Sequence, residues 1–299
     1  MSFMNLAVAL DRCNKVHQIY QPTSGVPNLI LLNNLFTLRL PKAPALPIVA
    51  NLPHSGLQVP EHIAKTFTPE HLLALPNSDW HLQPLYQFLP QLGITVLQAN
   101  YSRYVVDLNR ALKPPLFGSF WSAVVPEHTA FKQPIYVKKP SAEEVRSRIA
   151  TYYTPYHQKL TDLLHQTIAQ FGQAYLFDLH SFMGLITEDI CLGNADGKTC
   201  SEALIQLVNN RFTQQNYQVV NNKVFSGGHL TRHYGQQPNV EALQIELRYT
   251  NYLPIDQLEI EQIPTYQSQT FDNAQQKLKT AFQAVVAAMA SELEPVRRR

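Results

Sequence analysis

The sequence has few charged residues and almost no excess of either sign. Charged side chains make up 15% of its 299 residues, against about 25% in an average globular protein. With 24 basic and 22 acidic residues, the formal net charge is +2. A balance this close to neutral gives no general attraction to nucleic acid or to an acidic membrane surface. We therefore expect neither as a partner.

Cysteine and long apolar runs are also scarce. Cys13, Cys191 and Cys200 form no CxxC pair, which argues against a disulfide framework or a thiolate zinc site and favours a reducing compartment. The sequence lacks the apolar run of about 18 residues that a transmembrane helix needs. Its opening residues lack the basic stretch of a signal peptide. These features predict a cytoplasmic protein without a membrane association.

What is present is an alternation of strand-like and helix-like segments, in a chain that is 45% hydrophobic. The expected strands are 46–52, 94–99, 104–108, 174–179 and 241–249, and the expected helices are 79–92, 141–150, 155–171, 201–212 and 268–293. This alternation predicts an α/β layered fold with a mixed, largely parallel sheet. We expect residues 1–40 to form an N-terminal extension and residues 41–299 a single domain.

Two histidines lie at the carboxyl ends of expected strands, where the sites of α/β sheets gather. His54 follows strand 46–52, and His180 follows strand 174–179. Together with Asp79, these histidines would give three ligands and an open position for water, which is the pattern of catalytic zinc. A lone histidine is usually a surface or hydrogen-bonded residue. The matching positions of the two favour a metal site.

A second group of polar residues flanks the expected strand 104–108. Arg103 and Arg110 lie seven residues apart, and Asn109 stands beside the second arginine. A planar guanidinium pairs bidentately with a carboxylate, so these residues could bind an acidic substrate. An ion pair between Asp107 and one arginine, which would only fix the end of a strand, explains the pattern equally well.

Two more candidates lie toward the carboxyl end of the chain. Arg232 lies in the glycine-bounded segment 227–235, which is either a loop that closes over a substrate or an ordinary surface loop. In strand geometry Glu246 shares a face with Gln244 and Arg248. That face is either exposed to solvent or turned to the site, where Glu246 would act as a general base on metal-bound water.

Taken together, these residues resemble the N-formylglutamate amidohydrolase family. The resemblance extends from about residue 35 to 290, and its parts occur in the family's order. The matching segments are PHSG at 53–56, SDWHLQPLY at 78–86, SRYVVDLNR at 102–110, DLHS at 178–181, and GGHLTRHYG at 227–235 followed by ALQIELR at 242–248.

The resemblance implies a fold similar to zinc carboxypeptidases and aspartoacylases, with a mixed, mostly parallel eight-stranded sheet between helices. It also implies one zinc ion per chain, bound by two histidines and a carboxylate, here His54, His180 and Asp79. The His-x-x-Glu pair of the carboxypeptidases is absent after His54. Glu61 and Glu70 are therefore the alternative carboxylate ligands.

The implied activity is hydrolysis of N-formyl-L-glutamate to formate and L-glutamate, a step of histidine degradation. In the corresponding hypothesis Glu246 transfers the proton and Arg103 stabilises the tetrahedral oxyanion. Asn109 and Arg110 would hold the α-carboxylate, and Arg232 the side-chain carboxylate. Which arginine takes which role is open.

Three other functions are compatible with the sequence. The same zinc site could hydrolyse another N-acyl amino acid or a peptidoglycan amide, since related folds host several substrates. The chain could instead be an inactive binding protein, in which Asn77 replaces an aspartate ligand. A serine hydrolase built on Ser55 or Ser181 is disfavoured, because neither serine lies in a G-x-S-x-G motif. The oligomeric state is open.

Overall fold

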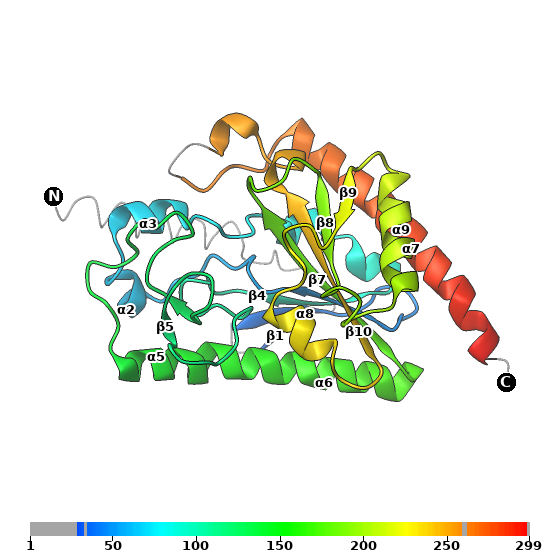
Figure 1. The fold of residues 1–299 in the computed structure, drawn as a ribbon, viewed down its shortest axis with the longest axis horizontal. Coiled ribbons are helices and arrows are strands. Elements are labelled where there is room, and N and C mark those ends of the chain that lie inside the picture. Colours follow the sequence, from blue (N-terminus) through cyan, green and yellow to red (C-terminus); the bar gives the residue numbers. More distant parts are fainter. Residues whose placement is uncertain (1–28, 33–34, 259–261, 298–299) are drawn as a thin grey trace.

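A single mixed sheet of eight strands forms the centre of the computed structural model, which describes residues 29–32, 35–258 and 262–297 (Figure 1). From one edge to the other, the strands are β1 (Leu29–Leu32), β2 (Phe36–Arg39), β4 (Thr95–Ala99), β3 (Ile48–Leu52), β7 (Ala174–Phe182), β10 (Val240–Arg248), β8 (Ile190–Gly193) and β9 (Val219–Asn221). A separate pair consists of β5 (Phe117–Gly118) and β6 (Val125–Pro126).

The four central strands β4, β3, β7 and β10 are mutually parallel. Strands β2 and β8 flank them in the antiparallel direction, β1 is antiparallel to β2, and β9 is parallel to β8. The predicted mixed, mostly parallel eight-stranded sheet is confirmed. Strands β1 and β2 belong to the segment 1–40, so part of the expected extension pairs with the sheet.

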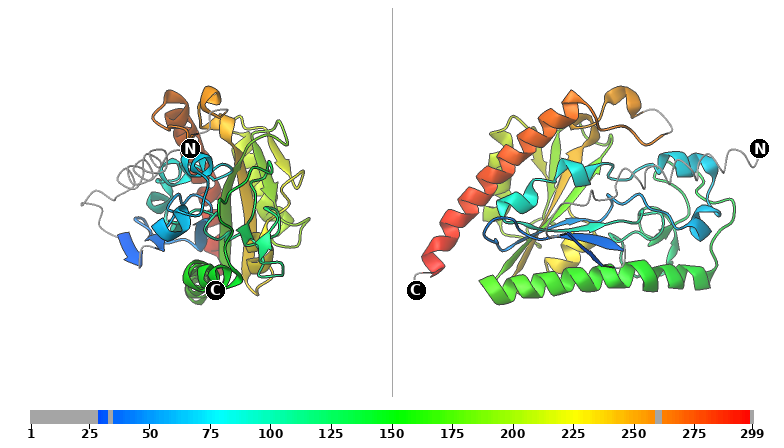
Figure 2. Two further views of the ribbon diagram at one scale, coloured as in Figure 1. Left: turned by 90° about the vertical axis from the view of Figure 1, so that its left-hand side faces the viewer. Right: turned by 180° about the vertical axis from the view of Figure 1, so that it is seen from behind.

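Helices cover both faces of the sheet, which makes a three-layer fold (Figure 2). One face packs against α6 (Thr154–Phe171) and α8 (His229–Tyr234), and the other against α7 (Glu202–Thr213) and α9 (Gln269–Arg297). The shorter helices are α2 (Glu61–Ala64), α3 (Pro69–Ala74), α4 (Leu82–Leu85) and α5 (Ala142–Arg148). A π-helical segment, Ile149–Tyr153, joins α5 to α6, and 3-10 turns form at Leu89–Leu92, Tyr249–Asn251 and Ile255–Gln257.

Side chains on β7 alternate between these two layers, as the period of a strand requires. Phe177 and Leu179 pack in the core beneath α7 and α9, whereas Leu176 packs in the core beneath α6 and α8. On the face of Leu176 the next two residues toward the carboxyl end are Asp178 and His180, both buried. On this face of β7, the first side chains therefore pack in the hydrophobic core, and those near the carboxyl end supply polar groups to the candidate site.

Strand β10 repeats this pattern beside β7. Leu243 and Ile245 pack on the α7–α9 side, and Ala242 packs on the α6–α8 side. The buried Gln244 and Glu246 follow Ala242 on its face. This face is covered rather than exposed to solvent, so the polar residues of both strands line one enclosed region at the carboxyl ends of the parallel strands.

The strand expected at 104–108 is wrong, because this segment forms consecutive turns. The Val105 N–H donates to the Ser102 carbonyl oxygen at 2.9 Å, and the Asp107 side chain accepts from the Asn109 N–H at 2.9 Å. The Tyr104 N–H also donates to Ser102 Oγ at 3.2 Å. Such short-range bonds to aspartate and serine side chains favour turns over strand pairing.

The continuous helix expected over 79–92 is also wrong. Only α4 and the 3-10 turn Leu89–Leu92 form in this range. His81 precedes α4 with a left-handed φ of 61°. Pro84 and Pro90 lack the N–H that a continuous helix would require. The remaining expected strands and helices are present, with ends that differ by a few residues.

Two further sequence expectations concern membranes and cysteines. No helix in the described part of the chain is long and apolar enough to cross a membrane. Cys191 and Cys200 are free, buried thiols, in agreement with the absence of a disulfide framework. Cys13 lies outside the described residues.

Candidate metal centre

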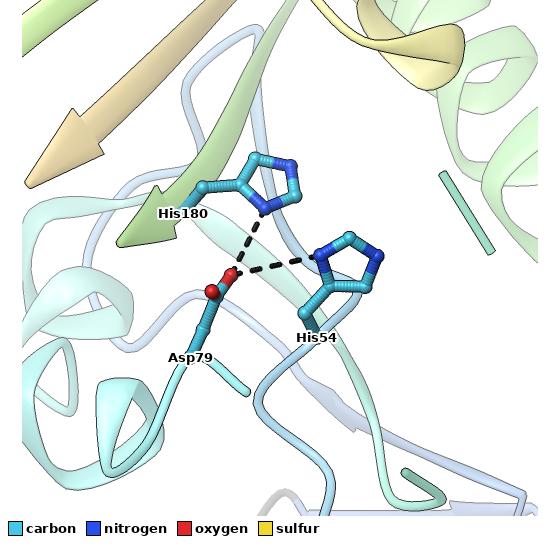
Figure 3. Close-up of side chains that lie close together, drawn as sticks. All are labelled: His54, Asp79 and His180. Carbon is cyan, nitrogen blue, oxygen red and sulfur yellow. Dashed lines mark hydrogen bonds and ion pairs between the residues drawn. The ribbon is translucent and has the colours of Figure 1, made fainter. Parts of the chain in front are cut away.

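Three of the sequence-predicted residues, His54, Asp79 and His180, form a buried cluster (Figure 3). His54 follows β3, His180 lies near the end of β7, and Asp79 lies in the segment between α3 and α4. Asp79 Oδ2 is 2.9 Å from His180 Nδ1 and 3.9 Å from His54 Nδ1. One donor atom from each residue lies within 4.8 Å of the others, so the three could hold a metal ion.

A tight loop brings Asp79 to the two histidines. The Asp79 N–H donates to the His54 carbonyl oxygen at 3.1 Å. Asn77 and His81, on either side, have left-handed φ values of 59° and 61°. Arg103 Nη1 donates to the Asn77 carbonyl oxygen at 2.9 Å, which ties the loop to the turns beyond β4. Asp79 therefore reaches the cluster from a tight turn, and not from the start of the helix expected over 79–92.

The second ring nitrogen of each histidine faces a buried carboxylate. His54 Nε2 lies 2.8 Å from Asp107 Oδ1, and His180 Nε2 lies 3.2 Å from Asp178 Oδ1. A carboxylate that accepts Nε2–H leaves Nδ1 free to bind a metal, and such partners orient metal-binding histidines. Both Nδ1 atoms indeed face Asp79.

Asp107 is held ionised by Arg103. The guanidinium donates to Asp107 Oδ2 from Nε at 3.1 Å and from Nη2 at 2.6 Å. Burial raises the pKa of Asp107, but the charge of Arg103 and the hydrogen bond with His54 outweigh it and hold that pKa well below its usual range. Burial and the nearby Arg103 charge lower the pKa of His54 to about 4, which keeps the ring neutral as metal ligation requires. The Asp107–Arg103 ion pair considered from the sequence is therefore present.

Asp178 lies in a network of buried polar side chains. It accepts from Asn51 Nδ2 at 2.8 Å and from Thr231 Oγ1 at 2.9 Å. The Tyr156 hydroxyl donates to Asn51 at 2.5 Å. Burial raises the pKa of Asp178, but the His180 charge and these hydrogen bonds outweigh it and lower the pKa. The network fixes an ionised carboxylate behind His180.

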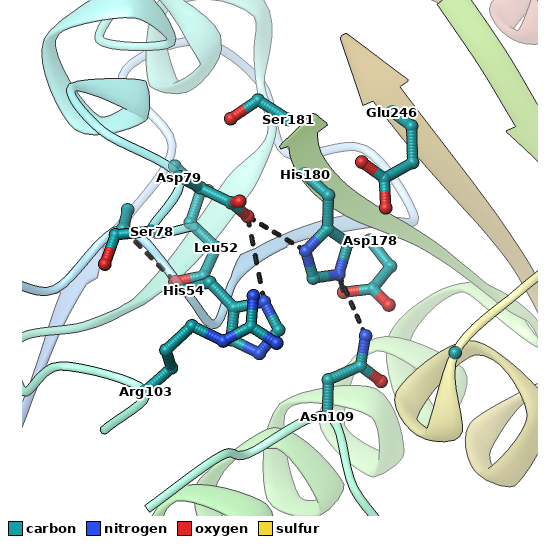
Figure 4. Close-up of polar contacts among 12 residues, drawn as sticks. Leu52, His54, Ser78, Asp79, Arg103, Asn109, Asp178, His180, Ser181 and Glu246 are labelled. Carbon is teal, nitrogen blue, oxygen red and sulfur yellow. Dashed lines mark hydrogen bonds and ion pairs between the residues drawn. The ribbon is translucent and has the colours of Figure 1, made fainter. Parts of the chain in front are cut away.

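The charge balance at the cluster suits a cation. Burial lowers the pKa of His180, but Asp178 and Asp79 outweigh it and hold the pKa well above its usual range. A bound metal ion would take the place of this proton beside the same two carboxylates. Burial raises the pKa of Glu246 to about 8. Its Oε1 accepts from Gln244 at 2.9 Å, while the buried Oε2 has no hydrogen-bond partner among the described residues (Figure 4). Histidine and carboxylate ligands beside an unpartnered carboxylate oxygen fit a zinc ion with an open coordination position.

Asn109 is the one predicted substrate-binding residue in contact with the cluster. Its Nδ2 lies 3.2 Å from His180 Nε2, and its Oδ1 accepts from the Leu230 N–H at 2.8 Å. Arg110 lies next to it and is half-buried. Its Nε donates to the Phe120 carbonyl oxygen at 3.1 Å, and its Nη1 to the Asn109 carbonyl oxygen at 2.9 Å.

The other sequence candidates lie apart from the cluster. Arg232 is exposed on α8, and its guanidinium bonds to the Gly227 carbonyl oxygen and to Ser226, both in the turn before its own helix. The alternative carboxylates Glu61 and Glu70 are exposed. The Asn77 side chain accepts from the Ala130 N–H at 3.4 Å, away from the candidate ligands.

Sequence reasoning placed Gln244 on the face of Glu246 but assigned no role to it or to Asp178, although the strand period puts each beside a functional residue. Asp178 lies two positions before His180, and Gln244 lies two positions before Glu246. In a strand, residues two apart point to the same side. The spacing Asp-x-His and Gln-x-Glu therefore already places each supporting side chain beside its functional neighbour.

A buried cluster of two histidines and a carboxylate, at the carboxyl ends of parallel strands in an α/β fold, is the arrangement of a candidate metal-dependent hydrolase. The model of the N-formylglutamate amidohydrolase family matches residues 46–253. The chain belongs to this family, as its motifs predicted. It is accordingly an amidohydrolase, an enzyme that cleaves an amide carbon–nitrogen bond.

Relatives with this name agree in sequence and structure. The N-formylglutamate deformylase of Pseudomonas aeruginosa is 36% identical over 219 residues, which cover 69% of this chain and 82% of that protein. The one of Pseudomonas putida is 32% identical over 254 residues, covering 81% and 93%. The crystal structure of an N-formylglutamate amidohydrolase from Ralstonia eutropha JMP134 matches with a TM-score of 0.71 and 28% identity, covering 89% of this chain and 99% of that one.

Proposed function

We propose that this protein is a zinc-dependent deformylase that hydrolyses N-formyl-L-glutamate to formate and L-glutamate. The observation that carries the proposal is the cluster of His54, Asp79 and His180, with the free oxygen of Glu246 nearby. The substrate is taken from the relatives named N-formylglutamate deformylase. As part of the same proposal, we infer that the reaction belongs to histidine degradation in the cytoplasm.

His54, Asp79 and His180 would hold the metal, and Asp107 and Asp178 would orient the two histidines. When bound, the metal supplies Lewis acidity, which lowers the pKa of water to about 7 and polarises the formyl carbonyl. The buried ligands keep bulk water from competing with the substrate. The chain itself must then move protons and hold the substrate.

Glu246 is the residue proposed to move the proton. Its Oε2 takes a proton from the attacking water while the water oxygen bonds to the formyl carbon. Glu246 then gives that proton to the amine nitrogen as the carbon–nitrogen bond breaks, releasing formate and L-glutamate. A pKa of about 8 for this carboxyl is close to the neutral value that suits a general acid and base.

The substrate carries two carboxylates, and the cationic side chains are assigned to them. Asn109 and Arg110 would hold the α-carboxylate close to the cluster, and Arg232 the side-chain carboxylate from α8. Arg103 already pairs with Asp107 and adjoins His54, so it would stabilise the oxyanion with its remaining N–H groups. One such donor is usually worth about 2.7–4 kcal/mol in the transition state.

Formate release from N-formyl-L-glutamate tests the proposal. The purified protein should turn over this substrate with zinc, lose activity with a chelator, and recover it when zinc is returned. N-formyl-L-norvaline is the matched control, because it has the same backbone but lacks the side-chain carboxylate, and it should react poorly. A folded, zinc-loaded protein that releases no formate would refute the assigned substrate. Turnover of N-acetyl-L-glutamate alone would identify another acyl group.

A further inference from the structure

We propose that Gln244 is a positioning residue, which orients Glu246 for proton transfer and couples that orientation to the turn at Gly227 and Gly228. The inference rests on the role proposed for Glu246. It concerns how this side chain is held, since among the described residues Gln244 has no hydrogen bond to the candidate metal ligands; its partners are Gly228 and Glu246.

The sheet places Gln244 in the same relation to Glu246 as Asp178 has to His180. In the register of the parallel strands β7 and β10, Gln244 pairs with Asp178, and Glu246 pairs with His180. All four side chains are buried on one face. Each strand thus supplies a functional residue and, one step back along the same face, a polar residue that contacts it.

The orientation of the Gln244 amide is determined by its two partners. Its Oε1 accepts from the Gly228 N–H at 2.5 Å, so the opposite atom, Nε2, donates to Glu246 Oε1 at 2.9 Å. The backbone N–H is always a donor, and an ionised carboxylate is always an acceptor. Reversing the amide would lose both bonds, so Gln244 stabilises the ionised form of Glu246 in one rotamer.

Only one oxygen of Glu246 is restrained in this way. Oε1 is bound to Gln244, while Oε2 is buried and, within the described residues, has no partner. Figure 4 shows the Glu246 carboxylate near His180, which also contacts Asp178 and Asn109. A glutamate side chain has three rotatable bonds, so the hydrogen bond from Gln244 restricts Glu246 to a rotamer that leaves its other oxygen, Oε2, available for proton transfer.

Close packing holds the turn in place above Gln244. A Cβ at Gly228 would lie 2.4 Å from Asn109 Nδ2. A Cβ at Gly193, the partner of Gln244 on β8, would lie 2.6 Å from the Gly227 nitrogen. The turn is therefore packed between the sheet and Asn109. A substrate bound by Asn109 would contact the same unit that holds Glu246, which links substrate binding to the general base.

The test replaces Gln244 by methionine, which has a similar shape but cannot form these hydrogen bonds. We expect Gln244→Met to lower kcat by about 10- to 100-fold, the loss typical of supporting residues around a metal site. The KM and the zinc dissociation constant should each stay within about threefold, because no ligand or substrate contact is removed. Gln98→Met is the matched control, since Gln98 is a buried glutamine on β4 that pairs with Leu52 and, among the described residues, has no hydrogen bond to Glu246 or to the candidate ligands, and its kcat should not change.

Crystal structures of the zinc-loaded wild type and Gln244→Met give a readout that does not depend on turnover. The carboxylate of Glu246 should shift or occupy two conformations in the variant. An unmoved Glu246, or an unchanged kcat with a displaced Glu246, would overturn the proposal. If Gln244→Met loses zinc affinity and thermal stability to an extent similar to its loss of kcat, Gln244 has a structural role only.

Two provisions keep this test decisive. If the wild type does not hydrolyse N-formyl-L-glutamate, the proposed substrate fails, but the conformation of Glu246 in the two crystal structures still decides whether Gln244 orients it. If the methionine variant does not fold, Gln244→Asn keeps the amide but withdraws it by one methylene, and the same displacement of Glu246 is expected.

Discussion

Glu246 presents two chemically different oxygens at the candidate site: Oε1 is hydrogen-bonded to Gln244, and Oε2 has no partner in the described part of the chain. If the free oxygen carries the proton, Glu246→Gln should lower kcat for deformylation by at least about 10²-fold, within the range of general acid–base catalysis. The amide keeps the hydrogen-bonding shape, so zinc content should remain one per chain. Steady-state formate release and metal analysis of the purified variant provide the two measurements.

The metal content of this variant distinguishes two roles for the same residue. A general base can be removed without loss of the metal, whereas loss of a ligand weakens the site itself. If Glu246→Gln is purified without zinc and takes up none on titration, Glu246 is a ligand, and the cluster of His54, Asp79 and His180 is incomplete as described.

Arg110 could either bind the substrate or only support the local structure, and a substitution distinguishes the two roles. Within the described segments, its guanidinium donates hydrogen bonds to two backbone carbonyl oxygens, those of Phe120 and Asn109, and to no carboxylate. We expect Arg110→Ala to raise the KM for N-formyl-L-glutamate by about tenfold or more, because a charge-assisted contact to a carboxylate is worth roughly 1.5–3 kcal/mol. Arg146→Ala, which removes an exposed arginine of α5, controls for net charge. An unchanged KM would leave Arg110 with the structural role alone.

At the scale of elements, the turn before α8 has no room for an added side-chain atom at Gly228. Gly228 lies against Asn109, and its N–H bonds to Gln244. The added methyl group of Gly228→Ala must displace the Asn109 side chain or the turn. Because a displacement of about 1 Å in a positioned group can cost about 10²-fold, we expect kcat/KM to fall at least tenfold. Steady-state kinetics checks this, and near-normal kcat/KM would show that the turn is compliant.

Among the elements, the sequence correctly predicted the strands and side-chain faces that follow from local periodicity. The apolar runs at 46–52 and 174–179 identified strands, and the residues after them identified His54 and His180. The alternation in 241–249 placed Glu246 and Gln244 on one face. These signals are local, since the side-chain period of a strand follows from its own backbone.

The failures occurred where side chains and prolines compete with regular structure. Segment 104–108 is rich in strand-forming residues, yet its backbone follows bonds to Ser102 and Asp107. Segment 79–92 has helical spacing, yet proline and a left-handed His81 limit it to short turns. The same two segments supply Asp107 and Asp79 to the site. Their positions depend on contacts with distant parts of the chain, which no local pattern records.

At the scale of the whole molecule, the candidate ligands join segments that are far apart in the chain. Asp79 and His180 are separated by 101 positions, yet Oδ2 and Nδ1 are 2.9 Å apart. An ion bound there would link β3, the loop before α4 and β7 in the folded state only. Binding to the folded state stabilises it by about 2.7 kcal/mol when the free ligand is at 100 times its dissociation constant.

This linkage predicts a thermal shift that can be measured without a substrate. Each kcal/mol raises Tm by about 2–4 °C in a domain of somewhat smaller size, so zinc at about 100 times Kd should raise Tm by roughly 5–10 °C. His180→Ala should remove most of the shift because it deletes a ligand. His128→Ala, which removes an exposed histidine, should retain it. An equal shift in both variants would mean that zinc stabilises the fold from another site, and the cluster between β3 and β7 would lose its assignment.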